Sequence, residues 1–359
     1  MTTELCQAAF SVLMPILSGD KPGERVRRHL NSGGVSVLLG GGDLPALRVT
    51  YQRSLAASQH YFAHLMAALE ACTELPLLVA VDQELGGLQH FCGPLPARST
   101  LSEFGHLSAD EIETRSYEQA SRARAVGINM FLAPMLDGVD SGLEGGLSDS
   151  ACAHGLHAAS EESLRIAAAF IRGVQRAGVV ATARYTSRYN EHECACSCLL
   201  ATDSSPAPHV RLCTPGFAAG AKAVMPWPAV FPSRRTSHTC EPAEQVPAVL
   251  GDAPVFEGLV VSDDLQALSI LRGESMGHTA VAALNAGAHV MIVTAESSLD
   301  DIADAILSAV REGELNPLTL LAAANKVRAA AQASRAQVDA GLYVSYSIAD
   351  GHITRRVMR

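Results

Sequence analysis

The sequence predicts an α/β protein built around parallel strands. Eight short apolar runs recur along the chain, and they are too short for helices and often rich in β-branched residues. Longer segments with helical periodicity separate them, and this alternating order makes neighbouring strands parallel. Eight such units favour a closed (β/α)₈ barrel, but the count alone leaves a doubly wound sheet open. The expected strands are Val12–Leu17, Val35–Leu39, Leu77–Val81, Ile128–Leu132, Val179–Thr182, Ala223–Met225, Leu259–Val261 and Val290–Val293.

Helical periodicity is clear in several of the connecting segments. In Glu161–Ala177, Leu164 and Ile171 fall on one apolar face, and Gly178 follows as a C-terminal stop. The tail Val344–Arg359 has no strong period and is expected to be a packed or frayed extension. Further helices are expected at Leu299–Val310 and at Pro317–Gln332, the second with Asn316 as its N-cap.

The composition narrows the class of protein. Hydrophobic residues make up 48% and charged residues 18% of the 359, which fits one globular domain over residues 1–359 with strands covered on both faces. A net charge of −10 argues against nucleic acid or an anionic membrane as the main partner, because both require clustered Lys and Arg. The start lacks the features of a secretory signal, and the nine cysteines do not suggest a disulfide framework. We therefore expect a cytoplasmic protein with reduced thiols.

Charged and polar residues follow most of the expected strands. In a barrel, functional side chains lie just beyond the carboxyl ends of the strands. Carboxylates gathered at one barrel mouth suit either hard metal ions or carbohydrate chemistry, and the residue pattern does not separate the two. No nucleotide-binding motif is present, so no cofactor is expected. The residues in these positions are Asp82, Gln83, Glu84, Asp137, Arg184, Tyr185, Trp227, Asp263 and Asp264.

Four segments carry a resemblance to a known family. Residues 80–91, AVDQELGGLQHF, resemble the IDQEGGRVQRF signature of bacterial β-N-acetylhexosaminidases of glycoside hydrolase family 3, the NagZ-like group. Residues 128–137, 169–182 and 258–265 resemble three further segments of that family in the same order. The resemblance extends from Phe10 to Ser334 and implies a (β/α)₈ TIM-type barrel.

The resemblance also implies roles for individual residues. Asp263 matches the nucleophile of the family's retaining mechanism, and Asp82 matches an Asp that holds a sugar hydroxyl. Arg184 keeps the cation of a family Lys, so it is expected to bind the substrate. Asp264 is expected to be structural, and structural hydrogen bonding under the rim is also the preferred interpretation of Glu84.

The loop after Arg184 departs from the family pattern. The family reads KHFPGHGD there, with a His as general acid/base, whereas residues 184–191 read RYTSRYNE. Tyr185 and Tyr189 replace both histidines. His192 is the candidate for the lost acid/base role, because imidazole exchanges a proton near neutral pH, while a solvated loop is the alternative.

Other positions near the mouth also differ from the family. Residues 146–152 lack the family's substrate-contacting Arg, and His289 replaces a family Asp. Trp227 replaces a family His and is expected to stack on a sugar ring, with a core aromatic as the alternative. Cys194, Cys196 and Cys198 lack the usual spacing of zinc ligands, so no metal is expected.

Three functions are compatible with this combination of matches and departures. The first is a divergent retaining β-glycosidase or β-N-acetylhexosaminidase that acts on a saccharide with Asp263 as nucleophile. The second is a barrel that has lost hydrolysis and binds a ligand or a partner. The third keeps Asp263 for non-hydrolytic chemistry on a small metabolite, because a fold alone does not fix a function.

Overall fold

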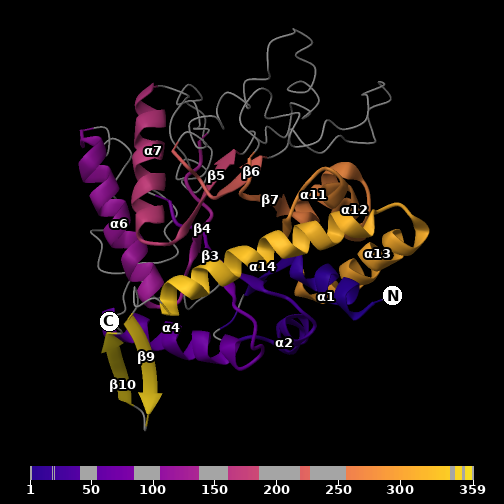
Figure 1. Cartoon of the computed structure of the whole chain (residues 1–359), viewed down its shortest axis with the longest axis horizontal. Coiled ribbons are helices and arrows are strands. Elements are labelled where there is room, and N and C mark those ends of the chain that lie inside the picture. The colour runs from indigo at the N-terminus through magenta and orange to yellow at the C-terminus, as the bar shows by residue number, and fades with distance from the viewer. Residues whose placement is uncertain are drawn as a thin grey trace, which may run out of the picture.

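Eight parallel strands close into a barrel in the computed structural model (Figure 1). Each strand pairs with its neighbour in sequence, and β8 pairs with β1 through Leu13 opposite Met291 and Pro15 opposite Val293. The eight expected strands are confirmed, and closure excludes the doubly wound sheet. The strands are β1 (Leu13–Leu17), β2 (Ser36–Leu39), β3 (Leu78–Val81), β4 (Met130–Phe131), β5 (Val180–Tyr185), β6 (Ala223–Pro226), β7 (Leu259–Asp264) and β8 (Val290–Val293).

The structure describes residues 2–17, 19, 21–40, 55–84, 106–136, 161–185, 219–226, 256–339, 344–349 and 352–357. In these ranges no helix is long and apolar enough to cross a membrane. The single-domain expectation stays a prediction.

Helices follow the strands and surround the barrel. The three helices named from periodicity are confirmed, and the last runs on to Asp339. Asn316 caps it by accepting a hydrogen bond from the Leu318 backbone N–H at 2.9 Å, and Gly178 ends its helix with a φ of 77°. The helices are α1 (Thr3–Ser11), α2 (Glu24–Asn31), α4 (Leu55–Glu70), α6 (Ala109–Ala125), α7 (Glu161–Arg176), α11 (Leu265–Arg272), α12 (Met276–Asn285), the 3₁₀ turn η2 (Glu296–Ser298), α13 (Leu299–Glu312) and α14 (Pro317–Asp339).

The barrel interior is apolar and is closed at one end by α14. Val327 and Ala331 of α14 join the interior cluster, and Arg328 Nε donates to Ser11 Oγ at 3.1 Å just before β1. Figure 1 shows α14 crossing the strands as one long helix. Because this helix covers the amino-terminal end, the carboxyl-terminal end is left for function. The interior cluster includes Met14, Leu38, Leu78, Ala80, Met130, Leu132, Ala223, Met225, Val261 and Ile292.

The tail differs from the expected extension. Val344–Ala349 (β9) and His352–Val357 (β10) form an antiparallel hairpin, drawn in yellow beside the C-terminus in Figure 1. The alternation of Val344 and Tyr346 with serines is a period-two pattern, and that signal was available in the sequence.

Close packing of α6 on α7 depends on a glycine. A Cβ added at Gly173 would overlap the Glu113 carbonyl oxygen and lie 2.8 Å from Ser116 Cβ. The same contact carries two ion pairs, in which Glu113 accepts from Arg172 at 3.1 Å and from Arg176 at 2.8 Å. A small residue at position 173 therefore sets the distance between these two helices.

Replacing Gly173 with Ala should destabilise the protein by about 1–3 kcal/mol, although Ala is the better helix former by about 1 kcal/mol. The added methyl would meet backbone, which cannot rotate away. Chemical denaturation measures the difference. Gly19→Ala is the control, because a Cβ there would meet nothing nearer than 3.5 Å. A stabilised Gly173→Ala protein would contradict the packing argument.

Candidate active site

Three predicted site residues continue the inward-facing rows of their strands. Leu78 and Ala80 point into the interior, and Asp82 is next in that alternation. Val180 packs against the same cluster, and Arg184 lies four residues further along β5. Side chains that alternate inward along parallel strands converge at the carboxyl rim. The barrel therefore brings Asp82, Arg184 and Asp263 to one mouth.

Arg184 lies between two carboxylates. Its Nη1 donates to Asp82 Oδ1 at 2.7 Å, and its Nε lies 3.7 Å from Glu84 Oε1. The side chains of Arg184, Asp82 and Glu84 are 11%, 25% and 6% exposed, so the arginine is held mostly out of water. Such a charge-assisted contact fixes both partners in orientation.

Asp263 is a partly buried carboxylate with a raised pKa. Burial is the main cause, and the Asp264 and Asp82 charges add to it. The hydrogen bond from the Asp264 backbone N–H at 2.8 Å and the positive charge of Arg184 act in the opposite direction. Asp263 is thus poorly solvated yet within electrostatic reach of Arg184, an environment in which a carboxylate is reactive.

Asp264 has the structural role that was expected. Its carboxylate caps α11 by accepting from the Gln266 and Ala267 backbone N–H groups, each at 3.3 Å. It also accepts from the Thr294 backbone N–H at 3.1 Å, just beyond β8. The β7–β8 register shifts between Val261 and Asp264, a bulge that allows two successive acids to serve different partners.

His289 holds β7 in place by an interaction that the sequence did not reveal. Its Nδ1 accepts from the Val260 backbone N–H at 2.9 Å, and its own backbone N–H donates to the Val260 carbonyl at 2.8 Å. Burial, assisted by the charge of Lys326, lowers the pKa of His289 to about 4. A neutral imidazole therefore fixes the strand that carries Asp263.

Two of the five predicted site residues, His192 and Trp227, lie outside the described residues, as do Asp137 and the Cys194–Cys198 segment. Within the described part of the chain, no group of three His, Cys, Asp or Glu side chains could hold a metal ion. Glu84 makes a structural hydrogen bond of the kind expected for it, because its Oε2 accepts from the Met135 backbone N–H at 3.2 Å. The alternation along the chain places Glu84 on the same side as Asp82.

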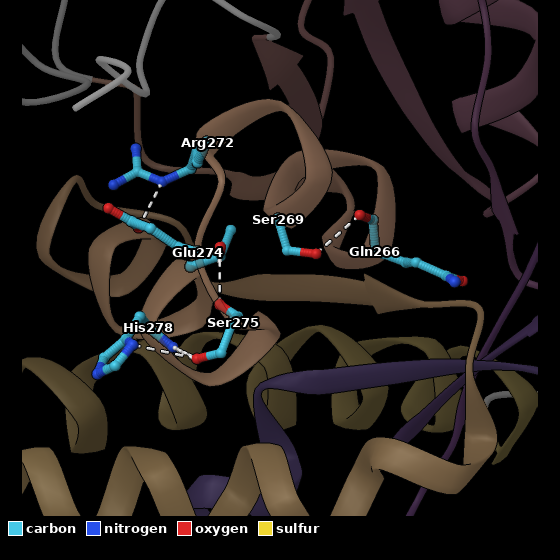
Figure 2. Close-up of polar contacts among 7 residues, drawn as sticks. Gln266, Ser269, Arg272, Glu274, Ser275 and His278 are labelled. Atoms are coloured by element: carbon cyan, nitrogen blue, oxygen red, sulfur yellow. Dashed lines mark hydrogen bonds and ion pairs between the residues drawn. The ribbon is translucent and has the colours of Figure 1, made fainter. Parts of the chain in front are cut away.

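A cavity of about 430 Å³ lies between the end of α11 and α12. It contains none of the predicted site residues. Figure 2 shows the Arg272–Glu274 ion pair in its wall, and Ser275 Oγ lies 3.1 Å from His278 Nδ1 beside it. Because the charged side chains converge at the barrel mouth, the mouth is a better candidate for the active site than this cavity. The cavity is lined by Arg272, Glu274, His278, Val281, Ala282, Asn285 and Glu314.

The closed parallel barrel, with carboxylates and an arginine on its carboxyl rim, defines a (β/α)₈-barrel protein with a charged site at its mouth. Residues 4–330 match the family described as Glycosyl hydrolase family 3 N terminal domain. The chain belongs to glycosyl hydrolase family 3.

Individual relatives agree with this membership. The chain is 28% identical over 273 residues to a Beta-hexosaminidase of Xylella fastidiosa (strain 9a5c), covering 72% of this chain and 78% of that protein. It is also 28% identical over 288 residues to a Beta-hexosaminidase of Stenotrophomonas maltophilia (strain R551-3), with coverage of 76% and 82%.

Solved structures show the same fold. The family 3 β-N-acetylglucosaminidase of Paenibacillus sp. str. FPU-7 superposes with a TM-score of 0.68 at 20% identity. That match covers 98% of this chain but 65% of the other protein. The β-N-acetylhexosaminidase of Beutenbergia cavernae DSM 12333 gives a TM-score of 0.66 at 22% identity, over 91% of this chain and 98% of the other.

The His289 interaction predicts a pH-dependent stability. Because its pKa falls from an ordinary 6.5 to about 4 on folding, only the unfolded chain binds the proton between these values. The contribution of neutral His289 to the free energy of unfolding, about 3 kcal/mol, is complete above pH 6.5 and is lost as the pH falls toward 4. The variant His289→Asn still offers the Val260 N–H an acceptor, but its side chain does not titrate. Its stability should therefore fall less steeply than that of wild type as the pH is lowered.

Unfolding free energies of both proteins between pH 4 and 7 measure this difference. The variant should keep part of the pH dependence of stability, since burial also lowers the pKa of His29, to about 3. The exposed His278 provides the control His278→Asn, which should leave the slope unchanged. Equal slopes for wild type and His289→Asn would show that His289 is not the titrating group.

Proposed function

We propose that the chain is a retaining β-N-acetylhexosaminidase-like glycosidase. The observation that carries the proposal is the meeting of Asp82, Arg184 and Asp263 at the carboxyl rim of a family 3 barrel. The relatives named Beta-hexosaminidase support the substrate class. A saccharide is the expected ligand, and a cytoplasmic location stays a prediction of the sequence.

The residues have distinct roles in this proposal. The ionised Asp263 carboxylate attacks the anomeric carbon, the glycosidic C–O bond breaks, and His192 donates a proton to the departing oxygen. His192 then takes a proton from water, which attacks the glycosyl ester and releases the sugar and the free carboxylate. Asp82 and Arg184 bind sugar hydroxyls, and Trp227 stacks on the ring.

The raised pKa of Asp263 fits the role of nucleophile. A carboxylate that is poorly hydrated in its ionised form loses little solvation on attack. The Arg184 charge and the Asp264 N–H both favour the ionised form and so limit how far burial raises the pKa. The activity should therefore fall in acid, as Asp263 becomes protonated at a pH above the ordinary range for Asp.

Asp263→Asn should abolish hydrolysis of nitrophenyl β-N-acetylglucosaminide, by roughly 10³-fold or more, because an amide cannot form the glycosyl ester. Nitrophenol release measures it. The variant should unfold at the same or a higher temperature, since it removes a carboxylate that is costly to ionise when folded.

Asp304→Asn, an exposed change on α13, is the matched control and should retain activity. Turnover that persists in Asp263→Asn would refute the assignment of the nucleophile. Wild-type protein that is inactive on both N-acetylglucosaminide and glucoside would instead favour a barrel that binds ligands without hydrolysis.

His192→Ala should affect substrates according to their leaving group. A poor leaving group such as an alkyl alcohol needs protonation, so its hydrolysis should slow roughly 10²–10⁴-fold, whereas nitrophenol should be released at a rate within about 10-fold of wild type. Rates on alkyl, phenyl and nitrophenyl glycosides measure this. Equal slowing of all three would exclude His192 as the proton donor, and Glu191 and Glu193 would be tested next.

A further inference from the structure

Glu84 is a buried carboxylate that connects three strand ends. It follows β3, and its Oε2 accepts from the Met135 backbone N–H at 3.2 Å beyond β4. Its Oε1 lies 3.7 Å from Arg184 Nε at the end of β5. Burying a carboxylate is costly unless a charge and hydrogen bonds compensate it, and here both come from other strand ends. Glu84 thus forms part of the rim.

The two carboxylates contact different edges of the same guanidinium. Asp82 faces Nη1 and Glu84 faces Nε, and the Arg184 backbone N–H donates to the Pro134 carbonyl, beyond the end of β4, at 3.0 Å. A planar group held at one edge can swing about that contact, whereas one held at two edges has a fixed plane. The Glu84 carboxylate lies at this second edge, 3.7 Å from Nε.

We propose that Glu84 is a positioning residue, which fixes the plane of the Arg184 guanidinium so that Asp82 and Arg184 present one rigid polar surface to the substrate hydroxyls. The inference rests on the proposed function, because it deepens the account of the same site. Glu84 acts through Arg184 and does not touch the reacting atoms. Binding of the sugar should therefore depend on Glu84 more than the chemical step does.

Glu84→Gln is the substitution that tests this positioning role most directly. Glutamine keeps the volume and an oxygen for the Met135 N–H but removes the charge that faces Arg184. For nitrophenyl β-N-acetylglucosaminide, KM should rise by about 10-fold while kcat stays within about 3-fold, because the lost contact serves the ground state and the transition state alike. A merely structural role would lower stability without this split.

The chain offers a matched control. Arg272 and Glu274 form another largely buried pair, with Nε and Oε2 3.0 Å apart and side chains 8% and 14% exposed, at the opposite end of α11 from Asp264 (Figure 2). Glu274→Gln makes the same chemical change there. It should leave KM and kcat as in wild type, and any loss of thermal stability in this variant shows the cost of neutralising a buried pair alone.

A second measurement does not depend on catalysis. In protein with ¹⁵N-labelled arginine, the Arg184 Nε–H signal, assigned by its loss in Arg184→Lys, should exchange slowly with solvent. Glu84→Gln should accelerate this exchange by at least about 10-fold, since a buried, ion-paired N–H exchanges only when the site opens to water. The Arg272 signal should respond only to Glu274→Gln.

The outcomes separate the two proposals. Inactive wild type with faster Arg184 exchange in Glu84→Gln refutes the glycosidase but retains the positioning of Arg184. Active wild type with unchanged Arg184 exchange, or with unchanged KM, in Glu84→Gln overturns the positioning role and leaves the proposed function intact.

Discussion

The pairing of β8 with β1 is the constraint on which the rest of this structure depends. Once those two strands join, the sheet has no open edge, and every carboxyl end lies on the same rim. Inward side chains then form successive apolar layers, which in β3 are Leu78 and Ala80. The next inward position, at the rim, is the charged Asp82. The position of the site follows from closure and from the alternation of side chains along each strand.

Charge at the rim is balanced within a small volume. Arg184 lies beside both Asp82 and Glu84, so the three together carry a net negative charge next to Asp263. Burial is the main cause of the raised pKa of Asp263; the Asp82 charge adds to it, and the Arg184 charge acts in the opposite direction. The arginine thus serves two purposes, because it orders the neighbouring carboxylates and sets the electrostatic environment of the proposed nucleophile.

The sequence predicts the strands well and the polar partners poorly, for a physical reason. Strands buried on both faces need continuous apolar runs, and such runs are visible locally. Asp82, Arg184 and Asp263 could be predicted because each follows such a run. The contact of Glu84 with Met135 joins residues 51 positions apart, and the His289–Val260 contact joins residues 29 apart. Neither has a local signature, so only folding reveals them.

Departures from the family pattern fall into two kinds. Two of them make defined contacts in this structure: His289, which replaces an Asp, accepts a hydrogen bond from the Val260 backbone N–H, and Arg184, which replaces a Lys, pairs with Asp82. Two others, Tyr185 at the end of β5 and Tyr189 outside the described residues, replace the two histidines of the family pattern. Under the proposed function, with Asp263 as nucleophile and a different proton donor, any change in activity should appear first as altered dependence on the leaving group, and only second as altered stability.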